Sequence, residues 1–301
     1  MNNWIFAALI ILATSLMGSS FAIGKMGLVY ASPILLVALR FSIAGVIMGI
    51  LVKLFNRSHP ASLKAWGKVA IVGLFQTTGV MACIFLSLKT INAGESSILT
   101  FTNPLLVVLF GTIFLKTKYK ILQWVGVSVG FVGVFITLRM SLRFEVGTIL
   151  GIGSAVSWAI ATLLIKIWGH EYDIWVLTAY QMLFGGLALF LISFLFEEPY
   201  FIVTKESVAI LLWLAIMASV VQFGSWFTVL KIGDPGKTSA FLFLAPFFGV
   251  LTGWILLNEQ LTLNVLFGGF LIIVGIFFVN WNPAYKREQQ LKETYSKANI
   301  T

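Results

Sequence analysis

Long apolar stretches alternate with short polar connections along the whole chain. A helix needs ~20 apolar residues to cross the ~30 Å hydrocarbon core of a bilayer, and ten stretches are about that long. The sequence therefore predicts ten membrane-spanning helices, at residues 4–24, 33–53, 68–88, 95–115, 121–138, 148–167, 174–196, 207–230, 236–257 and 262–281. No connection is long enough to fold as a separate domain, and the polar tail from Pro283 onward is expected to be frayed.

Composition identifies lipid as the solvent around most of this chain. Hydrophobic residues make up 59% of the 301 and charged residues 10%, with a mean hydropathy of +0.99, whereas a soluble domain carries roughly 25% charged residues. The first apolar stretch has no basic residue before it and is long enough to span, which favours a retained helix over a cleaved signal. We therefore expect an all-α polytopic membrane protein.

Lysine and arginine positions predict the orientation, because cytoplasmic connections carry an excess of both. The ten spans place fourteen of the twenty basic residues on one side and five on the other, with Arg40 inside a span. Both termini are accordingly expected in the cytoplasm. The net charge of +9 then serves membrane topology, and no nucleic-acid partner is expected.

The second half of the chain repeats the first. A constant offset in residue number aligns 85–135 with 227–277, and an offset smaller by one aligns earlier positions, such as Lys25 with Lys166. Shared membrane composition would produce scattered leucine and phenylalanine matches, whereas this alignment also matches lysine, proline and several glycines. The further pairs are Leu88-Lys89 with Leu230-Lys231, Gly94 with Gly236, Ser97 with Ser239, Phe101 with Phe243, Pro104 with Pro246, Gly126 with Gly268, Gly133 with Gly275, Ala38 with Ala179 and Gly45 with Gly186.

Each half holds five spans, and an odd number makes the second half enter the membrane from the opposite face. We therefore predict two inverted five-helix repeats, 1–141 and 142–282, and a cytoplasmic tail at 283–301. Inverted repeats are typical of secondary transporters, because exchanging the conformations of the halves converts an outward-open state into an inward-open one. Close helix packing, between halves or protomers, is expected at the glycines of the fifth and tenth spans. These are Gly126, Gly130, Gly133, Gly268, Gly269 and Gly275.

This pattern resembles the EamA-like branch of the drug/metabolite transporter superfamily over the whole chain before the tail. The residues that carry the likeness are Ala93-Gly94-Glu95-Ser96-Ser97, Pro104 and Gly126 to Gly133, with the copy Gly236-Lys237-Thr238-Ser239, Pro246, Glu259 and Gly268 to Gly275. Family members typically show a glutamate just after the fourth and ninth helices; this chain has Glu259 in the second copy and Thr117 in the first. The resemblance implies export of amino acids, related metabolites or drugs, without an ATP-binding module.

Two prolines related by the repeat lie in predicted spans. Pro104 and Pro246 are about ten residues into their helices, which the ~1.5 Å rise per residue places near the bilayer midplane. A proline there frees the carbonyl four residues earlier, at Thr100 and Leu242. The kinked backbone, with Asn103 beside it, either lines a substrate cavity, as broken helices do in transporters, or bends the helices for packing.

Arg40 is predicted about seven residues inside its span, roughly 10 Å deep by helix rise. A charge at this depth costs at least ~2.5 kcal/mol on insertion scales, so it needs a compensating interaction. Three are open: the carboxylate of a substrate, which suits the guanidinium, a structural pair with Glu95, or snorkelling to the headgroups. The repeat partner of Arg40 is Gln181.

Further polar and aromatic residues are predicted at membrane depth. A small-molecule cavity needs mostly apolar walls with a few polar anchors, and these side chains could supply both, although glutamine also bridges helices and tryptophan also packs or sits in an interfacial belt. The candidates are Gln76, Trp158, Tyr180, Gln181, Gln222 and Trp226. Together with Arg40, Asn103, Pro104 and Pro246 they form the predicted substrate site.

Several classes of chemistry are disfavoured. No Asp, Glu or His lies in the central part of a predicted span, Cys83 is the single cysteine, and no metal-ligand spacing occurs, so we expect no catalytic centre, metal or cofactor. Facilitated transport or exchange is favoured over proton coupling. A scaffold or receptor would explain the helices but not the repeat. The prediction is a monomeric or homodimeric plasma-membrane transporter of a bacterial cell, contacting lipid and a small metabolite, with amino-acid export favoured over drug export.

Overall fold

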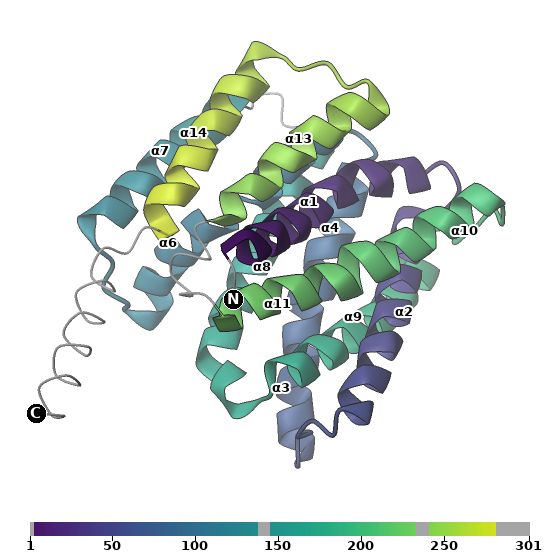
Figure 1. The fold of residues 1–301 in the computed structure, drawn as a ribbon. Helices are drawn as coiled ribbons and strands as arrows, with labels where there is room; N and C mark the ends of the chain where they lie inside the picture. The colour runs from purple at the N-terminus through teal and green to yellow at the C-terminus, as the bar shows by residue number, and fades with distance from the viewer. Residues whose placement is uncertain (1–2, 138–144, 233–240, 281–301) are drawn as a thin grey trace, which may run out of the picture.

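The computed structural model describes residues 3–137, 145–232 and 241–280 (Figure 1). These residues are almost entirely helical and contain no β-strand, only an isolated bridge between Ala31 and Phe201. The elements are α1 Asn3–Gly27, α2 Pro33–Leu54, α3 Leu63–Gly73, the π-helix η1 Leu74–Gly79, α4 Val80–Ser87, α5 Ala93–Thr100, α6 Asn103–Leu115, α7 Ile121–Thr137, α8 Val146–Trp168, η2 Gly169–Glu171, α9 Ile174–Phe196, α10 Lys205–Leu212, the π-helix η3 Trp213–Val221, α11 Gln222–Ile232, η4 Phe241–Phe243, α13 Leu244–Leu257 and α14 Leu263–Asn280.

Each of the ten predicted stretches is helical over most of its described residues. Seven helical segments are long and apolar enough to cross a membrane, and three shorter apolar helices lie at Ile121–Thr137, Leu244–Leu257 and Leu263–Val279. The predicted residues 236–240 of the ninth stretch, the end residues 138 and 281, and the predicted tail at 283–301 lie outside the described part of the chain. An all-helical, multi-pass membrane protein is therefore confirmed.

The outer surface of the bundle is apolar. Large hydrophobic side chains are well exposed on many helices, including Trp4, Phe114, Phe194 and Phe267. A soluble monomer rarely exposes such contiguous apolar surface, whereas lipid tails accept it. Inside, tightly packed apolar side chains such as Phe41 form the core.

The fourth predicted span is broken into two helices. α5 ends at Thr100, and α6 begins at Asn103 with Pro104 in its first turn. Proline is tolerated there, because its missing N–H would be unpaired at a helix start in any case. The kink predicted at Pro104 takes the form of an interruption at residues 101 and 102, within the single membrane-capable segment Ala93–Leu115. Pro246 likewise lies in the first turn of α13, directly after η4.

Two spans contain π-helical segments at repeat-related positions. η1 interrupts the span of α3 and α4, and η3 interrupts the span of α10 and α11. A π-segment widens the helix and frees backbone carbonyls, often at functional sites. Each segment makes a hydrogen bond with a side chain of the opposite half. Thr77 Oγ1 of η1 donates to Gln181 Oε1 at 2.9 Å, and Ser219 Oγ of η3 accepts from Arg40 Nε at 3.0 Å. Gln181 and Arg40 are repeat partners.

Residues of the first half pack mainly against residues of the second. α7 lies along α14, α2 along α9, and α1 along α13, while α8 packs against α4, α5 and α6 (Figure 1). The fold therefore buries the surface of each half against the other. Any cavity in its centre is consequently lined from both halves of the chain.

Glycines permit these contacts between halves, as predicted. A Cβ on Gly126 would lie 2.7 Å from the carbonyl oxygen of Gly275, and one on Gly133 would lie 2.6 Å from that of Gly268. Gly130 faces Leu105, and Gly269 lies against Ile98. Since no larger residue fits without moving backbone at the first two crossings, the glycine spacing sets the approach of α7 to α14.

Candidate substrate cavity

A cavity of about 490 Å³ lies between the two halves. Its volume is within the range of small-molecule sites, and its walls are mostly apolar with a few polar groups. Seven of the ten predicted site residues line it, namely Gln76, Asn103, Pro104, Trp158, Gln181, Gln222 and Trp226. They come from η1, α6, α8, α9 and α11, so the sequence repeats converge on one space.

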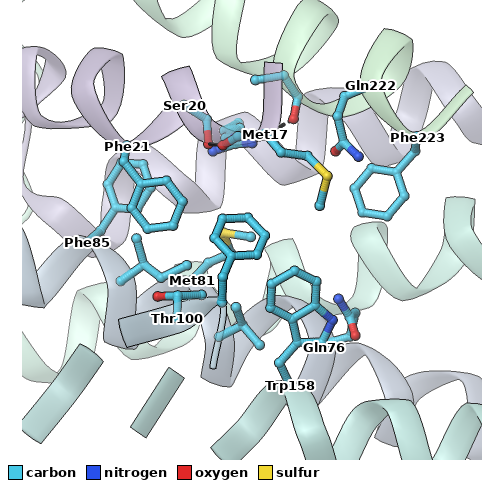
Figure 2. A pocket seen from close by; sticks show the side chains of 15 residues that line it. Met17, Ser20, Phe21, Gln76, Met81, Phe85, Thr100, Trp158, Gln222 and Phe223 are labelled. Carbon is cyan, nitrogen blue, oxygen red and sulfur yellow. Dashed lines mark hydrogen bonds between the residues drawn. The ribbon is translucent and has the colours of Figure 1, made fainter. Parts of the chain in front are cut away.

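A smaller cavity of about 50 Å³ extends this space deeper into the bundle. Both cavities share Gln76, Trp158 and Gln222 among their lining residues. The smaller one adds Arg40 and the aromatic residue Phe101, which stacks edge-on against Trp158. Figure 2 shows labelled side chains of the smaller cavity, among them Gln76, Trp158 and Phe223, pointing toward a common centre. The two cavities adjoin at these shared residues; the part of the larger one that Tyr119 lines is called its mouth below, and Arg40 lines the smaller one.

Arg40 is buried, with 3% of its surface exposed. Its Nε donates to Ser219 Oγ at 3.0 Å and its Nη2 donates to the Ala218 carbonyl at 2.8 Å, both in η3. Burial contradicts the snorkelling alternative, because the side chain does not reach the surface. Both acceptors are neutral, so they satisfy N–H groups without cancelling the charge. The π-segment of the opposite half therefore holds a guanidinium at the end of the cavity.

Gln222 has an unpaired donor in the same place. The residue begins α11 and is 4% exposed, and its Nε2 has no hydrogen-bond partner in the described part of the chain. Two other described side-chain atoms share this property, Ser42 Oγ and Ser97 Oγ, but neither residue lines these two cavities. A buried donor left unpaired costs roughly 1–3 kcal/mol. The amide lies beside Met17 and Phe223 (Figure 2), where a ligand acceptor would complete it.

Two predicted site residues lie away from both cavities. Tyr180 is one position before Gln181 on α9 and so faces another side of the helix. Its ring stacks edge-on against Trp66, 4.6 Å between centroids, and its hydroxyl lies 3.1 Å from His59 Nε2. Pro246 is buried in α13, which packs along α1. The structure therefore brings eight of the ten predicted residues to the cavities and places these two in packing contacts.

Other lining residues carried no signal in the sequence. Met17, Thr162 and Thr178 are of types found throughout the spans, so only packing reveals them. Tyr119 lies in the connection between α6 and α7, at the wide end of the larger cavity. Burial raises the pKa of its phenol, while a hydrogen bond with Thr117 lowers it, and the hydroxyl donates to the Val107 carbonyl at 3.4 Å. Connections can thus contribute to a site that span composition alone does not predict.

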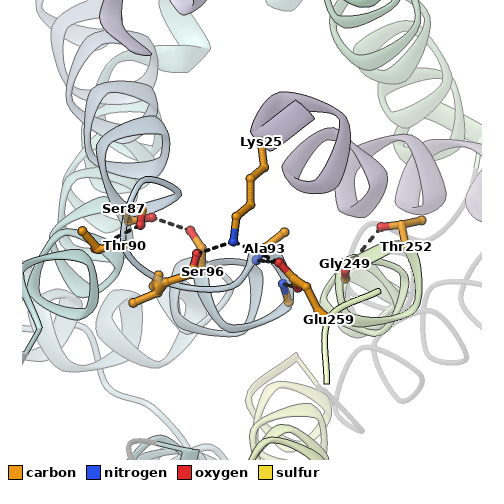
Figure 3. A network of polar contacts seen from close by, with 10 residues as sticks. Lys25, Ser87, Thr90, Ala93, Ser96, Gly249, Thr252 and Glu259 are labelled. Carbon is orange, nitrogen blue, oxygen red and sulfur yellow. Dashed lines mark hydrogen bonds and ion pairs between the residues drawn. The ribbon is translucent and has the colours of Figure 1, made fainter. Parts of the chain in front are cut away.

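A polar cluster lies at the other end of the bundle (Figure 3). Lys25 Nζ lies 3.1 Å from Glu259 Oε1 and donates to the Ile91 carbonyl at 2.8 Å. The same carboxylate accepts from the backbone N–H groups of Ala93, at 2.7 Å, and Gly94, at 3.2 Å. Because the span of α5 and α6 starts at this cluster and ends beside Tyr119, the cluster and the cavity mouth lie at opposite ends.

The fold and its central cavity define the class of this protein: a multi-pass membrane protein built around a small-molecule cavity. Comparison with known proteins identifies the family. The model of the EamA-like transporter family matches residues 4–139 and again residues 145–281. The chain therefore belongs to the EamA-like transporter family.

Individual relatives share most of their length with this chain. The uncharacterized transporter YoaV of Bacillus subtilis is 27% identical over 274 residues, covering 89% of this chain and 94% of the relative. Protein PecM of Dickeya dadantii is 24% identical, covering 86% and 87%. A solved crystal structure with 21% identity superposes with a TM-score of 0.64, covering 92% of this chain and 96% of that one. That structural likeness supports the fold alone.

Among the described residues, no group of three or more His, Cys, Asp or Glu side chains is arranged to hold a metal ion. The lining of the two cavities is of another kind, consisting of apolar side chains, amides, hydroxyls, aromatic rings and one guanidinium. Such a set offers the hydrogen-bonding groups and ring surfaces that a binding site for a polar solute needs. These described lining residues include no nucleophile paired with a base.

Proposed function

We propose that this protein is a secondary transporter that exports small metabolites, most directly amino acids or related compounds, by alternating access. The observation that carries the proposal is the central cavity, which both halves line with buried polar groups. Under this proposal residues 1–141 and 142–282 form two inverted repeats of five spans each, and residues 283–301 form a cytoplasmic tail. The site comprises Arg40 and Gln222 with the other predicted residues that line the cavities.

Matched contacts between the halves support the inverted repeat. Arg40 contacts Ser219, and Gln181 contacts Thr77. Arg40 is the repeat partner of Gln181, and Ser219 is the repeat partner of Thr77, so the two contacts correspond. The crossing of Gly126 with Gly275 corresponds in the same way to that of Gly133 with Gly268. Contacts exchanged in this manner are expected when an axis in the membrane plane relates two halves.

The orientation follows from the basic residues. Tyr119, at the wide end of the cavity, lies among Lys116, Lys118 and Lys120, on the side with the excess of positive charge. The positive-inside rule then places this end, and both termini, in the cytoplasm. The cavity accordingly faces the cytoplasm, as an exporter requires when it loads its substrate, and the bacterial plasma membrane is the proposed location.

The polar groups define the substrate class. Arg40 and the unpaired Nε2 of Gln222 are both donors, and no Asp or Glu is among the described residues that line either cavity. A carboxylate or other acceptor on the solute matches these donors, and the aromatic walls match an apolar body. A cationic solute would lack a countercharge from these residues. Drug export therefore remains an alternative for neutral or anionic compounds. A scaffold or receptor role, the other alternative, gives no reason for the repeat.

Efflux from cells with and without the protein, against a panel of amino acids and their derivatives, tests this function. We expect saturable transport in reconstituted vesicles without ATP. Gln222→Leu should raise the KM for carboxylate solutes, whereas Arg57→Ala, which removes an exposed arginine outside the cavity, should leave it unchanged. Absence of flux for every carboxylate solute, with flux for organic cations, would overturn the proposed substrate class.

A further inference from the structure

One helix ending occurs twice in this fold with the same backbone. After α6, Lys116 has a φ of 50°, and after α13, Asn258 has a φ of 52°. The next residue bonds back to a glycine in each case: Thr117 N to the Gly111 carbonyl at 3.0 Å, and Glu259 N to the Gly253 carbonyl at 3.2 Å. Positions 111, 116 and 117 are the repeat partners of 253, 258 and 259. The repeat therefore places residues 117 and 259 equivalently at opposite ends of the bundle.

The side chains at these equivalent positions make different contacts. Glu259, with 9% of its side chain exposed, holds the Lys25 ammonium and two backbone N–H groups at the start of α5. Thr117, which is partly exposed, accepts a hydrogen bond of 3.4 Å from Lys166, and its hydroxyl also bonds to Tyr119. Lys25 and Lys166 are themselves repeat partners. Each end of the fold thus has a lysine at the equivalent position, but only one end has a carboxylate to pair with it.

Both contacts join opposite halves. Lys25 and the α5 N–H groups belong to the first half and Glu259 to the second, so opening this end must separate the carboxylate from three donors. A charge-assisted bond is roughly twice as strong as a neutral one, and this one is mostly buried. The Lys166 contact is long, has a neutral acceptor and is exposed to water, so it resists separation far less.

Helix packing has the same asymmetry. A Cβ on Gly18 of α1 would lie 2.6 Å from the Gly249 nitrogen of α13, so these two backbones are in contact. The equivalent positions toward the cavity mouth hold Ala159 and Val107. Both carry a side chain where the first pair has only hydrogen, and both lie in one apolar cluster with Leu106 and Ala155. Close approach is therefore built into one end and not the other.

We infer that Glu259 and Lys25 form a latch that holds the outer end closed, and that Thr117 leaves the cytoplasmic end without a matching latch. The transporter then rests with its cavity open to the cytoplasm. This inference depends on the orientation proposed above. It concerns the resting state and not the identity of the substrate.

Cysteine accessibility tests the inference without any substrate. In a Cys83→Ser background, a Ser20→Cys reporter in the smaller cavity monitors the outer end, and a Thr162→Cys reporter in the larger cavity monitors the cytoplasmic end. An impermeant thiol reagent is added to intact cells for the first and to inside-out vesicles for the second. With the latch intact we expect rapid labelling of Thr162→Cys and slow labelling of Ser20→Cys.

Removing the latch should open the outer end. Glu259→Gln is expected to raise the labelling rate of Ser20→Cys from outside by at least about fivefold, a usual size for a shift between two conformations. Glu198→Gln, an exposed neutral substitution on the same side, is the control. If both variants label at the wild-type rate, the latch is overturned.

Adding a latch to the cytoplasmic end gives an independent test. Thr117→Glu should pair with Lys166, slow the labelling of Thr162→Cys and speed that of Ser20→Cys. The substituted position is partly exposed, so the variant should fold. Unchanged labelling at both reporters would overturn the asymmetry. Absence of flux in reconstituted vesicles, with these labelling changes present, would instead contradict the proposed transport function and leave the latch standing.

Discussion

The two ends of the bundle have the same helix-ending backbone but different side chains at the equivalent positions. At one end, Glu259 joins Lys25 to the start of α5, and Gly18 lies against Gly249. At the other end, Lys166 reaches the neutral hydroxyl of Thr117, and a cavity of about 490 Å³ opens nearby. A repeated fold can adopt two symmetry-related states, so sequence differences between the copies decide which state is favoured. Few substitutions suffice, because they act where the halves separate.

The largest effect is expected from filling the glycine crossing of the closed end. A Cβ at Gly249 would collide with the Ser97 side chain and lies close to α1. Gly249→Leu should therefore cost ~3 kcal/mol or more of stability, measured by thermal unfolding in detergent. Gly49→Leu is the matched control, because a Cβ there meets nothing within 4 Å. Equal melting temperatures for the two variants would show that the crossing is loose.

A second difference between the copies is the charge of Arg40 against the amide of Gln181. Arg40→Ala removes a charged donor from the end of the smaller cavity, and binding of a carboxylate solute should weaken by ~1.5–3 kcal/mol. Isothermal titration or the transport KM measures this loss. Arg57→Ala is the control on the surface. Normal affinity in Arg40→Ala would restrict Arg40 to its structural bonds with Ser219 and Ala218.

Stability should respond unequally at the two latch positions. Glu259→Ala leaves the N–H groups of Ala93 and Gly94 without their acceptor, which should cost ~1–3 kcal/mol. Thr117→Ala removes the long bond to Lys166 and the bond to Tyr119, both at a partly exposed position, and should change stability by less than ~0.5 kcal/mol. Chemical or thermal unfolding of both variants in the same detergent provides the comparison. Equal losses would show that the Glu259 contacts add nothing beyond those of Thr117.

The smallest effect is expected from the gain at Thr117. Thr117→Glu introduces an exposed pair with Lys166, and exposed pairs contribute ~0.2–1 kcal/mol. Because salt screens such charges, the gain in melting temperature at low salt should disappear in concentrated salt. A gain that persists in salt would indicate a buried pair instead.

Much of the fold was predictable from local pattern. Apolar stretches located the helices, because each span must satisfy its own backbone hydrogen bonds and present apolar side chains to lipid. The glycines at 126, 133, 268 and 275 predicted close helix packing, between halves or protomers, and the structure has it where α7 crosses α14. The kink at Pro104 was predicted from the proline, but its form, a break between Thr100 and Asn103, was not, since apolar residues continue through it. Hydropathy indicates which solvent surrounds a segment, and it does not show whether the helix in that segment is continuous.

The candidate site was only partly predictable. Polarity at membrane depth selected both Gln222 and Tyr180, but the first lines the cavities and the second stacks on Trp66. Which side of a helix faces the centre depends on its rotation, and spans that are apolar all round do not specify rotation. Arg40 was predicted as an anomaly, while its acceptors in η3 were not, because they are distant in the sequence.

The sequence by itself determined the membrane environment, the positions of the spans, the repeat and the difference between Thr117 and Glu259. Each of these is written in composition or in the comparison of one half with the other. Only the tertiary structure decided that Glu259 meets Lys25, from the far end of the chain, and that the Gln222 donor is left unpaired within the described residues. The reason is physical: burial and pairing depend on which helices pack together, and the chain's local pattern does not contain that information.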